Sequence, residues 1–129
     1  MTTVALVGAG GIADLHLPAL LTLGHDVVVF SGSDSARRLV DRHGGRVAGS
    51  LADALSECDV VDICTPTSTH RDLTVQAAEL GKHVICEKPL ALTLDDARDM
   101  RDACDRAGVS LFPAHVVRFF PEYAALHQA

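Results

Sequence analysis

The stretch V-A-L-V-G-A-G-G-I-A, residues 4–13, decides the fold of this chain. Its first four residues form a short apolar run rich in β-branched side chains, which is typical of a strand buried on both faces. A glycine-rich turn follows, and apolar residues then recur at helical spacing, at Ile12, Leu15, Ala19, Leu20 and Leu23. A strand, a glycine turn and a helix in this order predict the first half of a dinucleotide-binding βαβ unit.

The glycines fit the pattern G-x-G-x-x-A, with Ala13 where a third glycine often stands. Gly8 permits a sharp turn, and Gly10 permits close approach of the backbone to a pyrophosphate. The free N–H groups of the first helical turn, around Gly11 and Ile12, are expected to face the phosphates with the helix dipole behind them. Glycine turns also join strands to helices for structural reasons alone. The strand and helix on either side therefore favour nucleotide binding here.

Length and composition narrow the functional classes. A chain of 129 residues suits one domain, and its net charge of −6 argues against an extended nucleic-acid interface. No apolar run is long enough to cross a membrane, and the first residues lack the basic flank of a signal peptide. We therefore expect a cytoplasmic protein with neither a nucleic-acid nor a membrane partner.

The cysteines have neither C-x-x-C spacing nor histidines at zinc-finger intervals. They are expected to be reduced, buried side chains, with no disulfide and no metal site. Two of them, Cys64 and Cys86, stand near predicted strand ends, where contact with a ligand is an alternative. The full set is Cys58, Cys64, Cys86 and Cys104.

Strand-like and helix-like segments alternate along the rest of the chain. Further strands are expected at residues 26–30, 46–48, 59–64, 83–86 and 110–114, and helices at 34–43, 51–56, 69–80 and 94–107. Glycines stand where helices should stop, at Gly24, Gly44, Gly81 and Gly108. Two helices begin with capping-box spacing, Ser50 with Asp53 and Thr93 with Asp96. The alternation predicts an α/β fold, a parallel sheet covered on both faces in the doubly wound (Rossmann) order.

The second strand is followed by S-G-S-D, residues 31–34, where an adenosine ribose is expected. Proteins that bind NAD usually have a carboxylate at this strand end, but Gly32 stands there. Ser31 and Ser33, with Arg37 one turn later, suit a 2′-phosphate and therefore favour NADP over NAD. Asp34 can still reach the ribose, although capping of the next helix is its expected role.

The fourth strand ends in C-T-P-T-S-T-H, residues 64–70. Loops at the carboxyl ends of parallel strands are where such sheets bind ligands. Thr65 and Pro66 are therefore candidates for the nicotinamide side. Two interpretations of His70 stay open. It faces the cofactor or substrate, or it is a partly exposed residue in the first turn of a helix capped by Ser68 or Thr69.

The fifth strand ends in C-E-K-P-L, residues 86–90. Lys88 can hold a substrate hydroxyl or carbonyl and stabilise negative charge that develops on its oxygen. Glu87 would orient that lysine or bind the nicotinamide ribose. The alternative is an ion pair in a surface turn, which would stabilise the protein little.

Four stretches together resemble the Gfo/Idh/MocA oxidoreductases, the group of glucose–fructose oxidoreductase and inositol dehydrogenase. They are V-G-A-G-G-I-A (residues 7–13), C-T-P-T-S-T-H (64–70), G-K-H-V-I-C-E-K-P-L (81–90) and H-V-V-R-F-F-P (115–121). They follow the family's order and cover essentially the whole chain. The E-K-P segment with R-F-x-P behind it is far more specific than the glycine motif. The resemblance implies that Lys88 meets the substrate and supports catalysis, and that Glu87, Thr65, Pro66 and His70 line the nicotinamide side.

The resemblance also implies that a part of the protein is missing. Members of this family continue into a second α/β domain with an open antiparallel sheet, which supplies a proton-transfer histidine and most substrate contacts. We therefore expect an NAD(P)-binding domain at residues 1–117. Residues 118–129, with Arg118 at the junction, would begin the crossover to the second domain. Such a fragment should bind cofactor weakly and turn over little or no substrate.

The expected function is that of the nucleotide-binding half of an NAD(P)-dependent dehydrogenase. The complete enzyme would oxidise the CH–OH group of a sugar, cyclitol or related polyol, with Lys88 as a catalytic residue. The alternative is an NAD(P)-binding sensor or transcriptional co-regulator without redox turnover, which has little need of Lys88. Apolar residues near the end of the chain predict an exposed surface that drives self-association into homo-oligomers: Val116, Phe119, Phe120 and Tyr123.

Overall fold

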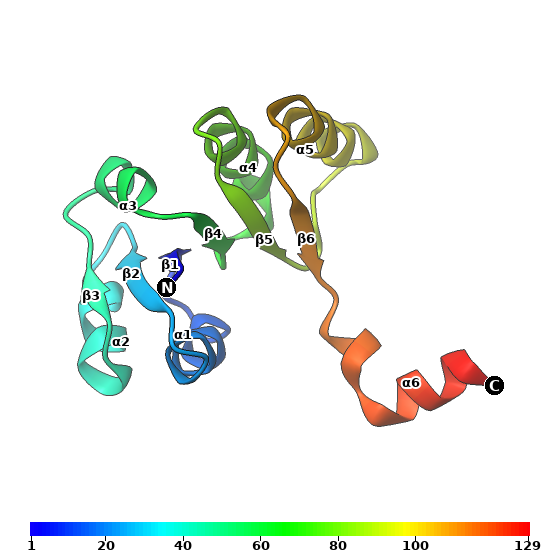
Figure 1. The fold of residues 1–129 in the computed structure, drawn as a ribbon, viewed down its shortest axis with the longest axis horizontal. Coiled ribbons are helices and arrows are strands. Elements are labelled where there is room, and N and C mark those ends of the chain that lie inside the picture. Colours follow the sequence, from blue (N-terminus) through cyan, green and yellow to red (C-terminus); the bar gives the residue numbers. More distant parts are fainter.

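Six parallel strands form one sheet in the order β3-β2-β1-β4-β5-β6, in a computed structural model that describes all 129 residues (Figure 1). In chain order the strands are Thr3–Val7 (β1), Asp26–Phe30 (β2), Arg46–Val47 (β3), Val60–Ile63 (β4), His83–Glu87 (β5) and Leu111–Ala114 (β6). The order reverses between β1 and β4, where ligands bind in doubly wound sheets. The Rossmann fold expected from the sequence is therefore confirmed.

Helices cover both faces of the sheet. In chain order the covering helices are Ala13–Thr22 (α1), Ser35–His43 (α2), Leu51–Glu57 (α3), His70–Glu79 (α4) and Leu94–Ala107 (α5), and a further helix, Pro121–Gln128 (α6), lies away from the sheet. Figure 1 shows α1 and α2 on one side of the strands and α3, α4 and α5 on the other. Two short 3₁₀ turns, Thr67–Thr69 (η1) and Val116–Phe119 (η2), precede α4 and α6.

The central strand β1 contributes to both layers of the core. Ala5 and Val7 pack into the larger apolar cluster on the α3–α5 side, whereas Leu6 packs into the smaller cluster with Leu17 of α1. Successive side chains of a strand point to opposite faces of the sheet. A strand covered by helices on both faces is therefore mostly apolar, which explains the run of apolar residues in β1. The cysteines are all free and buried, as expected.

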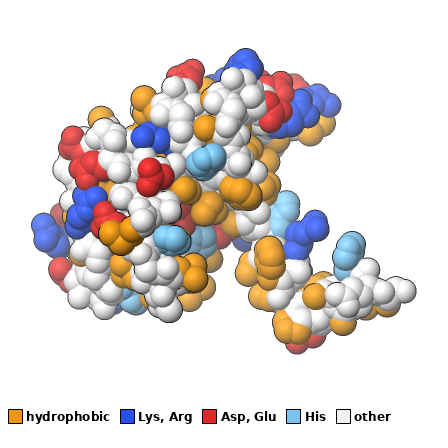
Figure 2. Space-filling model, viewed as in Figure 1, with side chains coloured by type: hydrophobic (Ala, Val, Ile, Leu, Met, Phe, Trp, Pro, Cys, Tyr) orange, Lys and Arg blue, Asp and Glu red, His pale blue; other side chains and the backbone are white.

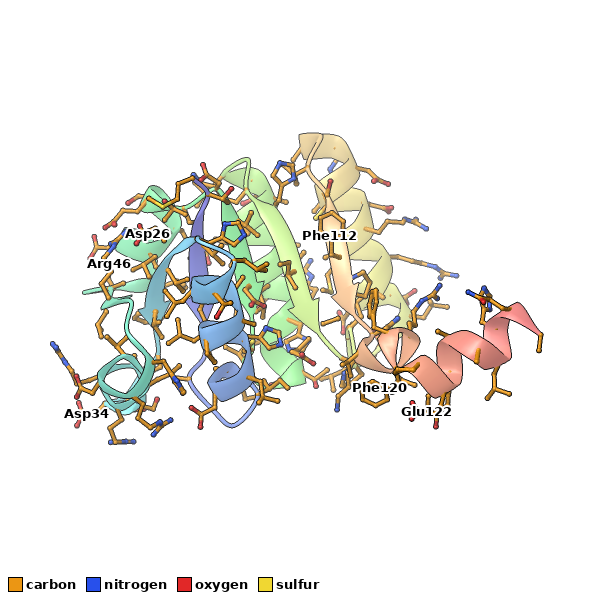
Figure 3. The ribbon with its side chains drawn as sticks, turned by 60° about the horizontal axis from the view of Figure 1, so that its bottom comes forward. Asp26, Asp34, Arg46, Phe112, Phe120 and Glu122 are labelled. Carbon is orange, nitrogen blue, oxygen red and sulfur yellow. The ribbon has the colours of Figure 1, made fainter.

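Helix caps follow the sequence in two places and depart from it in a third. Ser50 Oγ accepts the amide of Asp53 at 3.0 Å, and Thr93 Oγ1 accepts the amide of Asp96 at 3.1 Å. Asp34 was expected to cap α2, but its side chain makes no capping hydrogen bond. Its backbone is already helical (φ −67°, ψ −1°), whereas capping side chains usually stand on extended backbone. Figure 3 labels Asp34 at the start of α2.

Ser31 takes over the role expected of Asp34. Its Oγ accepts the amide of Ala36 at 3.1 Å, near the start of α2. The strand end that precedes α2 thus supplies the hydrogen-bond acceptor for this helix terminus.

The apolar stripe predicted along α1 is for the most part not the face that the helix buries against the sheet; of its residues, Leu20 packs against the core. Ala13 and Leu17 make that contact and are fully buried. Leu15 and Leu23, from the predicted stripe, are 68% and 72% exposed. A helix that is apolar on several faces is typical of one that is covered on several sides. The exposed stripe lines an apolar cavity of about 590 Å³, together with Phe119 and other residues that follow β6.

The C-terminal segment projects away from the sheet, with α6 at its far end (Figure 1). Its large apolar side chains are exposed, as expected: Val116, Phe119, Phe120 and Tyr123. Figure 2 shows hydrophobic side chains on this segment and on the neighbouring side of the main body, and Figure 3 labels Phe120 where α6 begins. No helix of the structure has the length and apolarity needed to span a lipid bilayer.

Candidate functional site

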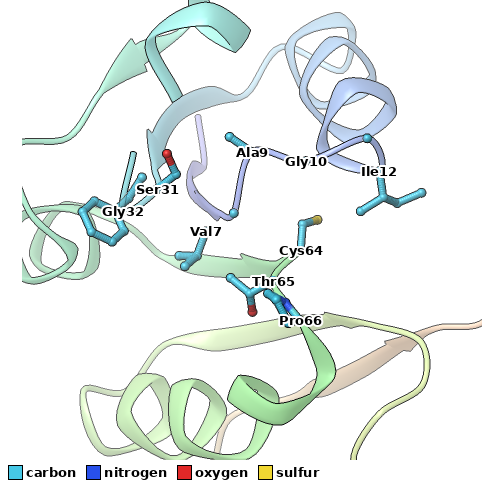
Figure 4. A pocket seen from close by; sticks show the side chains of 12 residues that line it. Val7, Ala9, Gly10, Ile12, Ser31, Gly32, Cys64, Thr65 and Pro66 are labelled. Carbon is cyan, nitrogen blue, oxygen red and sulfur yellow. The ribbon is translucent and has the colours of Figure 1, made fainter. Parts of the chain in front are cut away.

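A cavity of about 470 Å³ opens where the carboxyl ends of β1, β2 and β4 meet (Figure 4). The glycine turn after β1 forms its floor. The end of β2 and the segment after β4 form its walls. The lining residues are Val7, Gly8, Ala9, Gly10, Gly11, Ile12, Phe30, Ser31, Gly32, Cys64, Thr65 and Pro66.

The glycines of the turn differ in what surrounds them. Gly8 has a φ of +99°, and a Cβ built on it would lie 2.6 Å from the carbonyl oxygen of Cys64. No side chain fits there. A Cβ on Gly10 or on Gly11 would meet no atom within 4 Å. Nothing in the protein itself demands these two glycines, so the space above them is open to a ligand.

The backbone of this turn presents unused hydrogen-bond donors. The N–H groups of Gly10, Gly11 and Ile12 donate to no acceptor in the protein. They directly precede α1, which begins at Ala13, so the positive end of the helix dipole lies at the same place. Bare backbone, free amides and a helix N-terminus together fit the diphosphate of a dinucleotide.

The end of β2 lies at the same cavity through Ser31 and Gly32, and no carboxylate lines it. Ser31 Oγ is already engaged, because it donates to the carbonyl oxygen of Ser33 at 2.8 Å and lies 2.9 Å from Ser35 Oγ. Ser33 and Arg37 are exposed and do not line the cavity. The Arg37 guanidinium makes no ion pair within the protein.

His70 is the first residue of α4 and is only 1% exposed, so the partly exposed interpretation is wrong. Its Nε2 lies 2.9 Å from the carbonyl oxygen of Thr65, and its Nδ1 lies 3.0 Å from that of Pro89. The expected capping of this helix by Thr69 also fails, because Thr69 Oγ1 lies 2.7 Å from Thr65 Oγ1 instead. His70 therefore joins the segment after β4 to the segment after β5, and it lines neither neighbouring cavity.

Glu87 and Lys88 differ sharply in exposure. Glu87 is 7% exposed, and its Oε2 accepts the backbone N–H of Lys88 at 3.0 Å. The Lys88 side chain is exposed, and its ammonium group forms neither an ion pair nor a hydrogen bond. The surface ion pair considered as the alternative is therefore absent. Both residues line the apolar cavity beside α1, which leaves one free cation in largely apolar surroundings.

Two further residues of this site escape sequence analysis, His16 on α1 and Asp62 on β4. His16 Nδ1 lies 2.7 Å from Asp62 Oδ2, and His16 Nε2 lies 2.9 Å from Glu87 Oε1. The hydrogen bond to Asp62 is the main reason why the pKa of His16 is raised above its usual value, with Glu87 adding to it and burial opposing it. The one available signal is Asp62 itself, a charged residue within the apolar strand V-V-D-I.

Cys64 completes this cluster. Its thiol donates to Asp62 Oδ1 at 3.7 Å and lies 3.5 Å from His16 Nδ1. His16, Asp62 and Cys64 thus bring potential metal-binding atoms within 4.8 Å of one another. Both ring nitrogens of His16 already face carboxylates, and burial raises the pKa of the Cys64 thiol, which disfavours the thiolate that a metal needs. Hydrogen bonds therefore account for the cluster.

The oxidoreductase family model GFO_IDH_MocA, described by its NAD-binding Rossmann fold, matches residues 2–115. The chain belongs to the Gfo/Idh/MocA family. D-apiose dehydrogenase of Paraburkholderia graminis is 40% identical over 97% of this chain and 35% of its own length. For 1,5-anhydro-D-fructose reductase of Ensifer adhaerens the identity is 35%, over 100% of this chain and 40% of that protein.

A solved structure shares the same architecture. The WlbA dehydrogenase of Bordetella pertussis, in complex with NADH and UDP-GlcNAcA, matches with a TM-score of 0.91 and 29% identity, over 99% of this chain and 41% of that one. The chain thus spans between 35% and 41% of the length of these three relatives. Its fold and family make it an NAD-binding oxidoreductase domain. The relatives give no support to the sensor interpretation.

Proposed function

We propose that this domain binds NAD(P) for a dehydrogenase that acts on the CH–OH group of a sugar, cyclitol or related polyol. The observation that carries the proposal is the bare backbone of Gly10, Gly11 and Ile12, with its unused amides at the start of α1. The sugar-related names of the relatives support the substrate class.

In the cavity at the carboxyl ends of β1, β2 and β4, different residues would bind different parts of the dinucleotide. The glycine turn holds the diphosphate through backbone N–H groups, with Gly8 setting the turn and Gly10 and Gly11 leaving room. Thr65 and Pro66 form the wall after β4, on the nicotinamide side. The bound nicotinamide supplies the hydride acceptor, and the protein supplies position and electrostatics.

Lys88 is the residue that we assign to catalysis. Its free ammonium can pair with the substrate oxygen and stabilise negative charge on it, an interaction that strengthens in a largely apolar cavity. Glu87 orients the Lys88 backbone and would help to bind the nicotinamide ribose. His70 supports the same arrangement by holding the segments after β4 and β5 together.

The end of β2 favours NADP as the cofactor. No carboxylate lines the cavity there to bind both ribose hydroxyls, and Arg37, in the first turn of the helix that follows, is exposed without an ion-pair partner. A guanidinium binds a phosphate through two parallel hydrogen bonds. Arg37 and Ser33 would therefore meet a 2′-phosphate, although Ser31 is occupied by the capping of α2.

Calorimetric titration with NADH and NADPH tests cofactor binding and preference together. We expect NADPH to bind more tightly, and Arg37→Ala to remove most of that difference. Arg106→Ala, which removes an exposed and unpaired arginine from α5, is the matched control and should leave both affinities unchanged. If neither NADH nor NADPH binds, the proposal is refuted. If NADH binds more tightly than NADPH, only the proposed cofactor preference is refuted.

The greater length of the relatives supports the proposed division of the chain. Residues 1–117 form the cofactor domain, and residues 118–129 begin the connection to a domain that supplies most substrate contacts. This chain alone should therefore lack turnover. An assay against a panel of polyols tests that expectation, and robust activity would contradict it.

We further propose that the protein is a homo-oligomer. We also propose that it is cytoplasmic, because the cytoplasm is a reducing compartment and the cysteines of this chain are free.

A further inference from the structure

The cluster of His16, Asp62 and Glu87 places two carboxylates in the protein interior. Their side chains are 2% and 9% exposed, and the ring of His16 lies between them at 21% exposure. Buried carboxylates are costly unless a cation or several hydrogen bonds compensate them. A neutral imidazole donates one hydrogen bond, whereas the protonated ring donates two. The geometry therefore fits a protonated His16 that bridges both carboxylates.

The bridge reaches Lys88 through Glu87. One oxygen of Glu87 accepts from His16, and the other accepts the backbone N–H of Lys88 at 3.0 Å. The ammonium of Lys88 has no partner of its own in the protein. Its position therefore depends on the backbone that Glu87 holds, and Glu87 is in turn oriented by His16.

The same histidine belongs to the helix that presents the free amides. His16 lies in the first turn of α1, and its own amide donates to the carbonyl oxygen of Ile12 at 3.2 Å. Asp62 lies in β4 and pairs with Leu6 on one side and Ile85 on the other, so its backbone is fixed in the middle of the sheet. The cluster thus connects the phosphate-facing turn to the end of β5 through a rigid strand.

We propose that His16 is a positioning residue. It holds Glu87, and through Glu87 the backbone of Lys88, at a fixed position relative to the N-terminal end of α1, where the cofactor binds. This role rests on the proposed dehydrogenase function. Without His16, Asp62 and Glu87 repel each other and the Lys88 backbone loses its fixed acceptor. Hydride transfer is sensitive to such displacement, because a shift of about 1 Å can cost about 100-fold in rate.

Protonation of the ring makes the arrangement dependent on pH. The titratable groups that face His16 are those of the cluster and its cavity: Asp62, Cys64, Glu87, Lys88 and His115. Above the raised pKa of His16 the ring is neutral and donates to one carboxylate only. The kcat should therefore fall as the pH rises through that pKa.

The test uses the complete enzyme, including the residues beyond this chain, with His16→Gln, Asp62→Asn and a control. Glutamine is a neutral hydrogen-bond donor and does not titrate. His43→Gln is the control, because His43 Nε2 contacts Asp14 on α1 at 2.7 Å away from both cavities. We expect His16→Gln to lower kcat by about 10- to 100-fold. It should also abolish the decrease of kcat at high pH, which is the alkaline limb of the pH profile. His43→Gln should leave kcat unchanged.

Asp62→Asn keeps the shape of the side chain and serves if His16→Gln does not fold. It removes the main cause of the raised pKa of His16, so the alkaline limb should move to lower pH. An unmoved limb in Asp62→Asn, or a kcat in His16→Gln equal to that of the control, would overturn the role of His16. Turnover of the wild-type enzyme tests the dehydrogenase function separately, and its absence would overturn both.

Discussion

Substitution of two glycines in one turn should separate folding from cofactor binding. In Gly8→Ala the new methyl group lies 2.6 Å from the carbonyl oxygen of Cys64, on backbone with a φ of +99°. That carbonyl cannot move away easily, because the amide of Cys64 donates to Val7 at 2.8 Å. In Gly10→Ala the methyl group meets no protein atom within 4 Å.

The two substitutions should change different quantities: Gly8→Ala the stability of the protein, and Gly10→Ala its affinity for NADH. Left-handed backbone costs a non-glycine residue about 1–2 kcal/mol, and overpacking adds about 1–3 kcal/mol. Gly8→Ala should therefore lower the free energy of unfolding by about 2–5 kcal/mol, and the melting temperature by about 10 °C. Gly10→Ala should leave stability unchanged or raise it by less than about 1 kcal/mol. It should weaken NADH binding by about 10- to 100-fold, because a hydrogen bond to a charged group contributes about 1.5–3 kcal/mol.

Urea unfolding and calorimetric titration of NADH, performed on both variants and on the wild type, measure these quantities. Wild-type stability in Gly8→Ala would show that the contact with Cys64 does not constrain the turn. Wild-type NADH affinity in Gly10→Ala would show that the phosphates lie elsewhere, and the proposed cofactor site would then be wrong.

Three further predictions address catalysis, pH and association. In the complete enzyme, Lys88→Ala should lower kcat by about 100-fold or more with little change in NADH affinity; equal losses of both would contradict a catalytic role. The pKa of His16 is raised on folding, so its stabilising effect is complete below about pH 6.5 and is lost as the pH rises through the raised value. The difference in unfolding free energy between wild type and His16→Gln should therefore shrink at alkaline pH, and a difference independent of pH would count against the bridge. Light scattering should detect association of this chain through its exposed aromatic side chains, reduced in the double variant Phe119→Ser and Phe120→Ser; a wild type that stays monomeric at high concentration would refute this.

Local patterns were sufficient to predict the architecture. The apolar run in β1 and the glycine turn depend on neighbouring residues only, and the predicted helix 94–107 coincides with α5. Helix α1 is different, because it is apolar around most of its circumference. The sequence alone does not indicate that Leu17 meets the sheet while Leu15 faces the open cavity.

The site was predictable only in part, for a related reason. Turn residues such as Gly8 and Thr65 follow directly from strand ends, where parallel sheets place their ligands. The contact between His16 and Asp62 joins residues 46 positions apart, and no local pattern relates them. Asp62 is conspicuous as a charged residue in an apolar strand, but this does not identify His16 as its partner.

The end of β4 explains why cofactor binding and the position of Lys88 should depend on each other. Gly8 packs against the backbone of Cys64, so the phosphate-facing turn rests on the last residue before the Thr65 segment. Cys64 also contacts His16 through its side chain, and His16 orients the carboxylate beside Lys88. A change at Gly8 should therefore reach His16 through Cys64. For this reason Gly8→Ala should disturb Lys88 as well as the fold, whereas Gly10→Ala, which touches no neighbour, should affect the cofactor alone.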